Sequence, residues 1–168
     1  QDPMYGYPSR SYWTDVGKPA TYLKVHHDIL IGKVRYQFRG EQIAERVWAE
    51  QGVEIHPTAQ LVGPVVLGEG VRIGRGARII GPTVIGARCE IQADATIEGA
   101  VLWENNVIEE GASLRSCVVG RGNRIGPRAQ LASGTIVSDE CSIGGENRLE
   151  YGIRLWPGTQ LQDHAISF

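Results

Sequence analysis

The four histidines of this chain are its most obvious candidates for metal ligands or general bases. His26 and His27 are adjacent, so on a helix their side chains point about 100° apart and could not easily hold one ion. His56 and His164 lie far apart in the sequence, and a zinc site needs at least three converging protein ligands. We therefore expect all four to be packed or solvated, with no catalytic residue among them.

The three cysteines, Cys89, Cys117 and Cys141, show no CxxC spacing and are odd in number. Free, buried thiols in a reducing cytoplasm fit that pattern. The formal net charge is −2, so no basic surface indicates nucleic-acid binding. No apolar run reaches the ~18 residues of a membrane span, and no signal peptide is visible. The sequence therefore predicts a cytoplasmic protein with neither nucleic acid nor membrane as a partner.

A repeat of six residues must position most of these side chains. Large aliphatic residues occupy every sixth position in two unbroken series, from Ile55 to Ile97 and from Val119 to Leu161. Between the series lie three more, also six apart, with a step of five residues at each join: Leu102, Ile108 and Leu114. The residue four positions after each aliphatic stop is nearly always small or β-branched, and glycine often follows the stop directly.

The repeat predicts a triangular prism of short strands and corners, about three repeats to a coil. The aliphatic stops point inward and stack on the next coil, and glycines supply corner conformations that other residues reach with strain. Cys89 and Cys141 occupy the small inward position, which predicts core residues. Asn123 and Asn147 occupy the same position, which favours hydrogen-bonded ladders. We expect a kink or bulge at each five-residue join, and no long loop from Ile55 to Leu161.

Trp103 and Trp156 each follow an aliphatic stop and should face outward. Exposed tryptophans on a rigid rod indicate a contact surface, so both are candidate residues of a subunit or domain interface. Ordinary surface packing is the alternative.

Residues before the repeat favour a helix from Ala20 to Ile31, with Pro19 in its first turn and Gly32 at its exit. Tyr22, Leu23, Leu30 and Ile31 can share one face of that helix. Ile43 and Ala49 are in phase with Ile55, so the first coil is predicted to begin near Val47.

The run Tyr12-Trp13-Thr14-Asp15-Val16-Gly17, followed by Pro19 and Tyr22-Leu23, resembles the end of the catalytic domain of sugar-1-phosphate nucleotidyltransferases. It is most similar to mannose-1-phosphate guanylyltransferases, in which a helix, a connector and a left-handed β-helix follow. The stretch Val101–Ile108 is also similar to the β-helix of that family. The resemblance implies a mainly β fold: a single-stranded left-handed parallel β-helix of about six coils, preceded by a short helical segment.

The resemblance implies three regions: residues 1–33 as the end of a catalytic domain, 34–52 as a connector and 53–168 as the β-helix. The family's Gly-rich nucleotide loop and sugar-phosphate lysine motif have no counterpart here. The chain begins at Gln1 and its only methionine is Met4, so we expect a piece of a longer protein that is inactive alone. Asp15 matches the family's magnesium-binding aspartate, which implies Mg²⁺ as cofactor of the full-length enzyme only.

The parent enzyme would convert GTP and mannose 1-phosphate into GDP-mannose and pyrophosphate through its catalytic domain. The β-helix would serve homo-oligomerisation or regulation. A non-catalytic regulatory scaffold of the same architecture is one alternative. A hexapeptide-repeat acyltransferase that uses acetyl-coenzyme A is another, although the uninterrupted coils and scarce histidines disfavour it.

Overall fold

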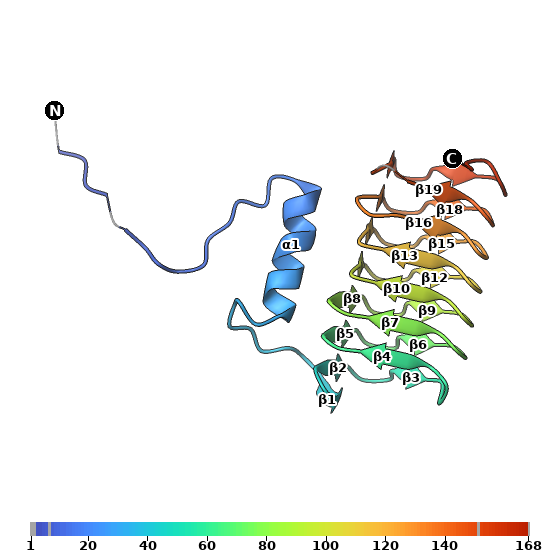
Figure 1. The fold of residues 1–168 in the computed structure, drawn as a ribbon, viewed down its shortest axis with the longest axis horizontal. Helices are drawn as coiled ribbons and strands as arrows, with labels where there is room; N and C mark the ends of the chain where they lie inside the picture. Colours follow the sequence, from blue (N-terminus) through green and yellow to red (C-terminus); the bar gives the residue numbers. More distant parts are fainter. Residues whose placement is uncertain (1–2, 7, 151, 168) are drawn as a thin grey trace.

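The chain forms a rod of stacked triangular coils with one helix beside it, as the computed structural model shows for residues 3–6, 8–150 and 152–167 (Figure 1). The rod is a left-handed parallel β-helix, as the family resemblance implied. Each coil contributes one short strand to each of three parallel sheets, which form the faces of the prism.

Within each coil the chain passes through the first, second and third sheets in that order. The first sheet contains β1 (Glu41–Ala44), β2 (Val47–Ala49), β5 (Val65–Leu67), β8 (Thr83–Ile85), β11 (Val101–Leu102), β14 (Val118–Val119), β17 (Ile136–Val137) and β20 (Arg154–Leu155). The second sheet contains β3 (Glu54–Ile55), β6 (Arg72–Ile73), β9 (Glu90–Ile91), β12 (Val107–Ile108), β15 (Arg124–Ile125), β18 (Ser142–Ile143) and β21 (Gln160–Leu161). The third sheet contains β4 (Gln60–Val62), β7 (Arg78–Ile80), β10 (Thr96–Glu98), β13 (Ser113–Arg115), β16 (Gln130–Leu131) and β19 (Arg148–Leu149).

The core is the column of aliphatic stops inside the prism. Stops pair directly between neighbouring coils, as Ile79 does with Ile97 and Ile97 with Leu114. From Leu67 to Leu149 the stops are buried, whereas Ile55 and Leu161 at the two ends are only partly covered. The strands make six complete coils and two strands of a seventh, which confirms the prediction of about six coils. Among the described residues, no connection from β2 to β21 exceeds four residues.

Two expectations about the corners are wrong. The five-residue joins produce no bulge, because β10 pairs with β13 and β11 with β14 without a register shift. The glycines that directly follow the stops are needed for space rather than for unusual dihedral angles. A Cβ on Gly126 would lie 2.6 Å from the carbonyl carbon of Gly144 in the next coil. Positive φ occurs two residues later in the hexad, as at Gly76 (φ 68°) and Arg88 (φ 56°).

The segment before the rod forms α1 (Pro19–Leu30), one residue displaced at each end from the prediction. Pro19 lies in the first turn and Gly32 follows the helix with φ 86°, as expected. Leu30 is buried, but Ile31 lies outside the helix and is 43% exposed, so its predicted place on the packed face is wrong.

The first coil begins at Val47, as its phase predicted, and residues 34–52 therefore contain β1 and β2 as well as the connection from α1. β1 runs antiparallel to β2 at the end of the first sheet. Within residues 3–6, 8–150 and 152–167, the structure contains no helix with the length and apolar character needed to span a bilayer.

Candidate functional site

The outer surface of the first sheet is apolar along most of its length. The residue before each stop points outward, and on this sheet six of those residues are apolar: Trp48, Val66, Val84, Val101, Val118 and Ile136. Arg154 of β20, at the far end of the column, is the charged exception. Corresponding positions on the second sheet include Glu54, Arg72, Glu90 and Arg124. An apolar outer column is unstable in water, so this sheet needs a cover.

Helix α1 provides that cover over part of the column (Figure 1). Ile29 and Leu30 of the helix, with Tyr36 and Phe38 after it, surround an apolar cavity of about 270 Å³ whose floor includes Val66 and Val84. Phe38 also lies against Trp48, with ring centroids 4.4 Å apart.

Polar contacts fix the helix in this position. His27 Nε2 lies 2.9 Å from the carbonyl oxygen of Gly99, at the first of the shortened corners. Arg46 donates a hydrogen bond of 3.0 Å to the carbonyl oxygen of Leu30 at the other end of the helix. His27 therefore helps to fix α1 against the rod.

Trp103 lies between the rod and α1. Its indole Nε1 donates to the hydroxyl of Tyr22 at 3.0 Å, and the Arg121 guanidinium carbon lies 5.3 Å from the centroid of its ring. The side chain is 36% exposed, so it contacts an element of its own chain and still reaches solvent. Trp156 occupies the same position three coils further on and is 82% exposed, and its interface role stays a prediction.

Asp15 lies in the extended stretch between residues 8 and 18 and is exposed. Its carboxylate is close to Gly17, where a Cβ would lie 3.3 Å from Oδ2. Within the part of the chain that the structure describes, no three or more His, Cys, Asp or Glu side chains converge as a metal site would require. Mg²⁺ often takes one or two protein carboxylates, with waters and substrate phosphates as its other ligands. Asp15 fits the part of one such ligand, and the remaining ligands would have to come from elsewhere.

His56 and His164 lie at opposite ends of the rod, in the first and seventh coils. His56 Nδ1 is 2.9 Å from Thr58 Oγ1, and His164 Nδ1 is 3.5 Å from a carboxylate oxygen of Glu146. The structure does not bring the two histidines together.

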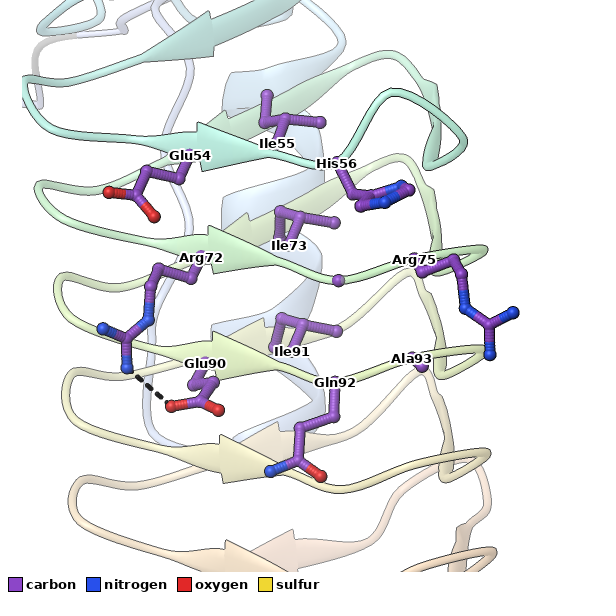
Figure 2. A pocket seen from close by; sticks show the side chains of 11 residues that line it. Glu54, Ile55, His56, Arg72, Ile73, Arg75, Glu90, Ile91, Gln92 and Ala93 are labelled. Atoms are coloured by element: carbon purple, nitrogen blue, oxygen red, sulfur yellow. Dashed lines mark hydrogen bonds and ion pairs between the residues drawn. The ribbon is translucent and has the colours of Figure 1, made fainter.

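A surface depression of about 550 Å³ lies on the second sheet across β3, β6 and β9 (Figure 2). Arg72 and Glu90 face each other there across neighbouring coils, with 2.7 Å between Nη2 and Oε2. Glu90 raises the pKa of Arg72 through this hydrogen bond. The stops Ile73 and Ile91 point into the rod rather than into the depression. This surface therefore carries a charge ladder, in which Arg72 and Glu90 of neighbouring coils neutralise each other. The residues that line the depression do not include a nucleophile paired with a base.

The inward corner residues are structural, as predicted. Cys89 and Cys117 are buried and free, and desolvation raises the pKa of their thiols to about 11 and about 12. The side-chain oxygen Oδ1 of Asn123 accepts from the backbone N–H of Cys141 at 2.7 Å. The backbone N–H of Asn123 in turn donates to Asn106 Oδ1 at 2.8 Å. These bonds form a ladder along one corner that includes Asn123 but not Asn147. Asn147 lies at another corner, where its Oδ1 accepts from the backbone N–H of Ile166 at 2.8 Å.

Two features of the site were absent from the sequence predictions. One is the apolar outer column, which appears only when every third hexad is compared. The other is Asp28, whose carboxylate is buried in α1 beside Lys24 and accepts from the hydroxyl of Tyr12. The spacing of four residues between Lys24 and Asp28 on a predicted helix was the available signal for an ion pair.

Fold and repeat together define a left-handed parallel β-helix protein of the hexapeptide-repeat class. The family described as the EIF2B subunit epsilon LbH domain matches residues 44–149, which is most of the rod. The chain belongs to this family.

A curated relative carries the similarity beyond the rod. A mannose-1-phosphate guanylyltransferase of Mycobacterium tuberculosis strain H37Rv is 31% identical over 173 aligned residues, covering 98% of this chain. The chain spans only 40% of the length of that relative.

Solved structures show the same fold at lower identity. A hexapeptide transferase family protein from Anaplasma phagocytophilum has 24% identity and a TM-score of 0.58, over 66% of this chain and 70% of that one. A candidate acetyltransferase from Bacillus cereus has 17% identity and a TM-score of 0.51, over 70% of this chain and 74% of that one. At these identities the likeness concerns the fold alone.

Proposed function

We propose that this chain is the β-helix part of a sugar-1-phosphate nucleotidyltransferase, most simply a mannose-1-phosphate guanylyltransferase. The parent enzyme would use GTP and mannose 1-phosphate to form GDP-mannose and pyrophosphate. The observation that carries the proposal is the 31% identity to such an enzyme across 98% of this chain. That match takes in the stretch before the rod, where Asp15 and α1 lie, as well as the coils.

In this proposal the Tyr12–Gly17 stretch is the end of a catalytic domain whose remainder lies upstream. Asp15 would supply one carboxylate to Mg²⁺, which when bound offsets phosphate charge and orients the phosphates for displacement. The chain's own contribution is then to hold Asp15 at the junction and to fix α1 against the rod. Residues that choose the nucleotide and the sugar would belong to the upstream domain.

Pyrophosphate release from the upstream-extended protein tests the proposal, with GTP and mannose 1-phosphate as substrates. We expect activity from the extended protein, none from residues 1–168 alone, and a fall in kcat of at least about 100-fold for Asp15→Asn. Inactivity of the extended protein with every nucleoside triphosphate and hexose 1-phosphate would contradict the proposed nucleotidyltransferase activity and support a regulatory scaffold.

The role proposed for the β-helix itself is self-association. Trp156 supports it, because an indole that is 82% exposed on a rigid rod offers a large apolar contact. Light scattering of residues 1–168 tests this role: we expect an oligomer that Trp156→Ser weakens, with Trp13→Ser as a control of similar exposure. A strict monomer at high concentration would contradict it.

The hexapeptide repeat itself leaves a second candidate, acyl transfer from acetyl-coenzyme A. Calorimetry with acetyl-coenzyme A separates the two candidates. We expect no binding by this chain, whereas micromolar binding lost in His56→Ala or His164→Ala would favour the acyltransferase.

A further inference from the structure

Asp28 differs from every other acidic or basic residue in the described part of the chain. Among residues 3–6, 8–150 and 152–167, it is the one charged residue that is buried, at 3% exposed. The other buried polar residues are neutral threonines and asparagines inside the rod. A buried carboxylate is costly unless hydrogen bonds and opposite charges stabilise it.

Three donors from three segments stabilise this carboxylate. The hydroxyl of Tyr12, in the extended stretch before α1, donates to Oδ2 at 2.9 Å. Lys33, after the helix, donates to Oδ1 at 2.7 Å, and Lys24 of the helix pairs with Oδ2. The two lysines, then the Tyr12 hydroxyl, hold the pKa of Asp28 well below its usual range.

The helix that carries Asp28 is itself fixed to the rod. His27, its neighbour, contacts the Gly99 carbonyl, and Tyr22 accepts from Trp103 one turn earlier. Contacts therefore run without a break from the rod to α1, from α1 to Asp28, and from Asp28 to Tyr12. Tyr12 is three residues before Asp15 and adjacent to Trp13.

We infer that Asp28 is a positioning residue that holds the Trp13–Gly17 stretch, and with it Asp15, at a fixed place relative to the β-helix. The inference rests on the proposed function only where it concerns Mg²⁺. By this route the rod stabilises the geometry of a metal-binding carboxylate that it does not touch.

The first test uses residues 1–168 and backbone ¹⁵N relaxation. We expect order parameters of about 0.8 for residues 13–17 in the unaltered chain, falling below about 0.6 in Tyr12→Phe. Tyr12→Phe removes only the hydroxyl, so the rod and α1 should keep their chemical shifts. Tyr5→Phe is the matched control, because Tyr5 is 90% exposed in the same N-terminal stretch. Unchanged order parameters in Tyr12→Phe would overturn the inference.

The second test uses the upstream-extended protein and the Mg²⁺ concentration at half-maximal rate. We expect Asp28→Ala and Tyr12→Phe each to raise that midpoint about tenfold, as loss of a hydrogen bond to a charged group predicts. The double variant should be no worse than either single variant, and Asp28→Asn, which still accepts from Tyr12, should recover part of the loss. Additive effects, or a fall in kcat at an unchanged midpoint, would overturn the inference.

The two tests separate this inference from the proposed function. If the extended protein is inactive before any substitution, the proposed function fails. The relaxation measurement still decides whether Asp28 orders the Trp13–Gly17 stretch.

Discussion

The first and second sheets have the same interior and opposite exteriors. Inside, both present aliphatic stops such as Ile85 and Ile91, which are 0% and 1% exposed. Outside, the first sheet presents valines that α1 covers, whereas the second presents the Arg72–Glu90 ion pair. The hexad therefore encodes one strand and one corner, and the outward residues that recur once per coil, about every 18 positions, encode which face of the rod binds another element.

The largest expected effect concerns the interior, where the two faces should behave alike. Ile85→Ala and Ile91→Ala should each lower the free energy of unfolding by about 2–5 kcal/mol, through lost burial and a residual cavity. Guanidinium titration followed by circular dichroism measures both. A difference of more than about 2 kcal/mol between them would show that α1 contributes to the interior as well as to the exterior.

The next effect concerns the exterior, where the faces should differ. Val84→Arg places a charge under α1 and should cost about 1–3 kcal/mol. Arg72→Val makes the reverse change on the open second sheet and should alter stability by less than about 0.5 kcal/mol. Urea titration of both variants is the measurement, and equal costs would contradict the assignment of the first sheet as the covered face.

A smaller effect should follow from the contact that holds α1 at the shortened corner. His27→Ala removes the hydrogen bond to Gly99 and should cost about 1 kcal/mol. Limited proteolysis in residues 31–40 should become faster at the same time, because the helix detaches more often. His56→Ala is the control, since His56 is exposed on the second sheet and, in the described structure, its side chain forms hydrogen bonds only with Thr58.

The smallest effect concerns the charge ladder on the second sheet. Glu90→Gln should cost about 0.2–1 kcal/mol at low salt, because the Arg72–Glu90 pair is exposed. Salt near 1 M should remove most of that difference. A double-mutant cycle with Arg72→Gln isolates the coupling energy between Arg72 and Glu90. A coupling energy that persists at high salt would contradict the exposure of this pair to solvent.

The interior of the rod could be predicted from the sequence because an aliphatic residue recurs at every sixth position, one for each strand. Ile97 and Leu114 keep their inward positions even across the five-residue joins, since the corners absorb the missing residue. Handedness and the identity of the parent protein came from resemblance rather than from the periodicity. The sequence predicted that the glycines after the stops supply unusual dihedral angles, whereas the structure needs them because no side chain fits there. Both requirements select glycine, so the sequence could not distinguish them.

The candidate site was less predictable because its contacts join positions far apart in the sequence. Tyr22 and Trp103 are 81 residues apart, and His27 and Gly99 are 72 apart. The bond from Tyr12 to Asp28 depends on the path of an extended stretch, which no periodicity describes. Asp15 could be singled out only by its surrounding motif, and its metal role stays a prediction.

The reversed direction of β1 has a consequence for polymerisation. Stacked parallel coils resemble the cross-β arrangement, in which an exposed edge can recruit identical segments indefinitely. At the first coil, β1 occupies the edge of β2 in the antiparallel sense, so another parallel coil cannot add to the first sheet there. A strand of four residues thus caps the first sheet at this end of the rod.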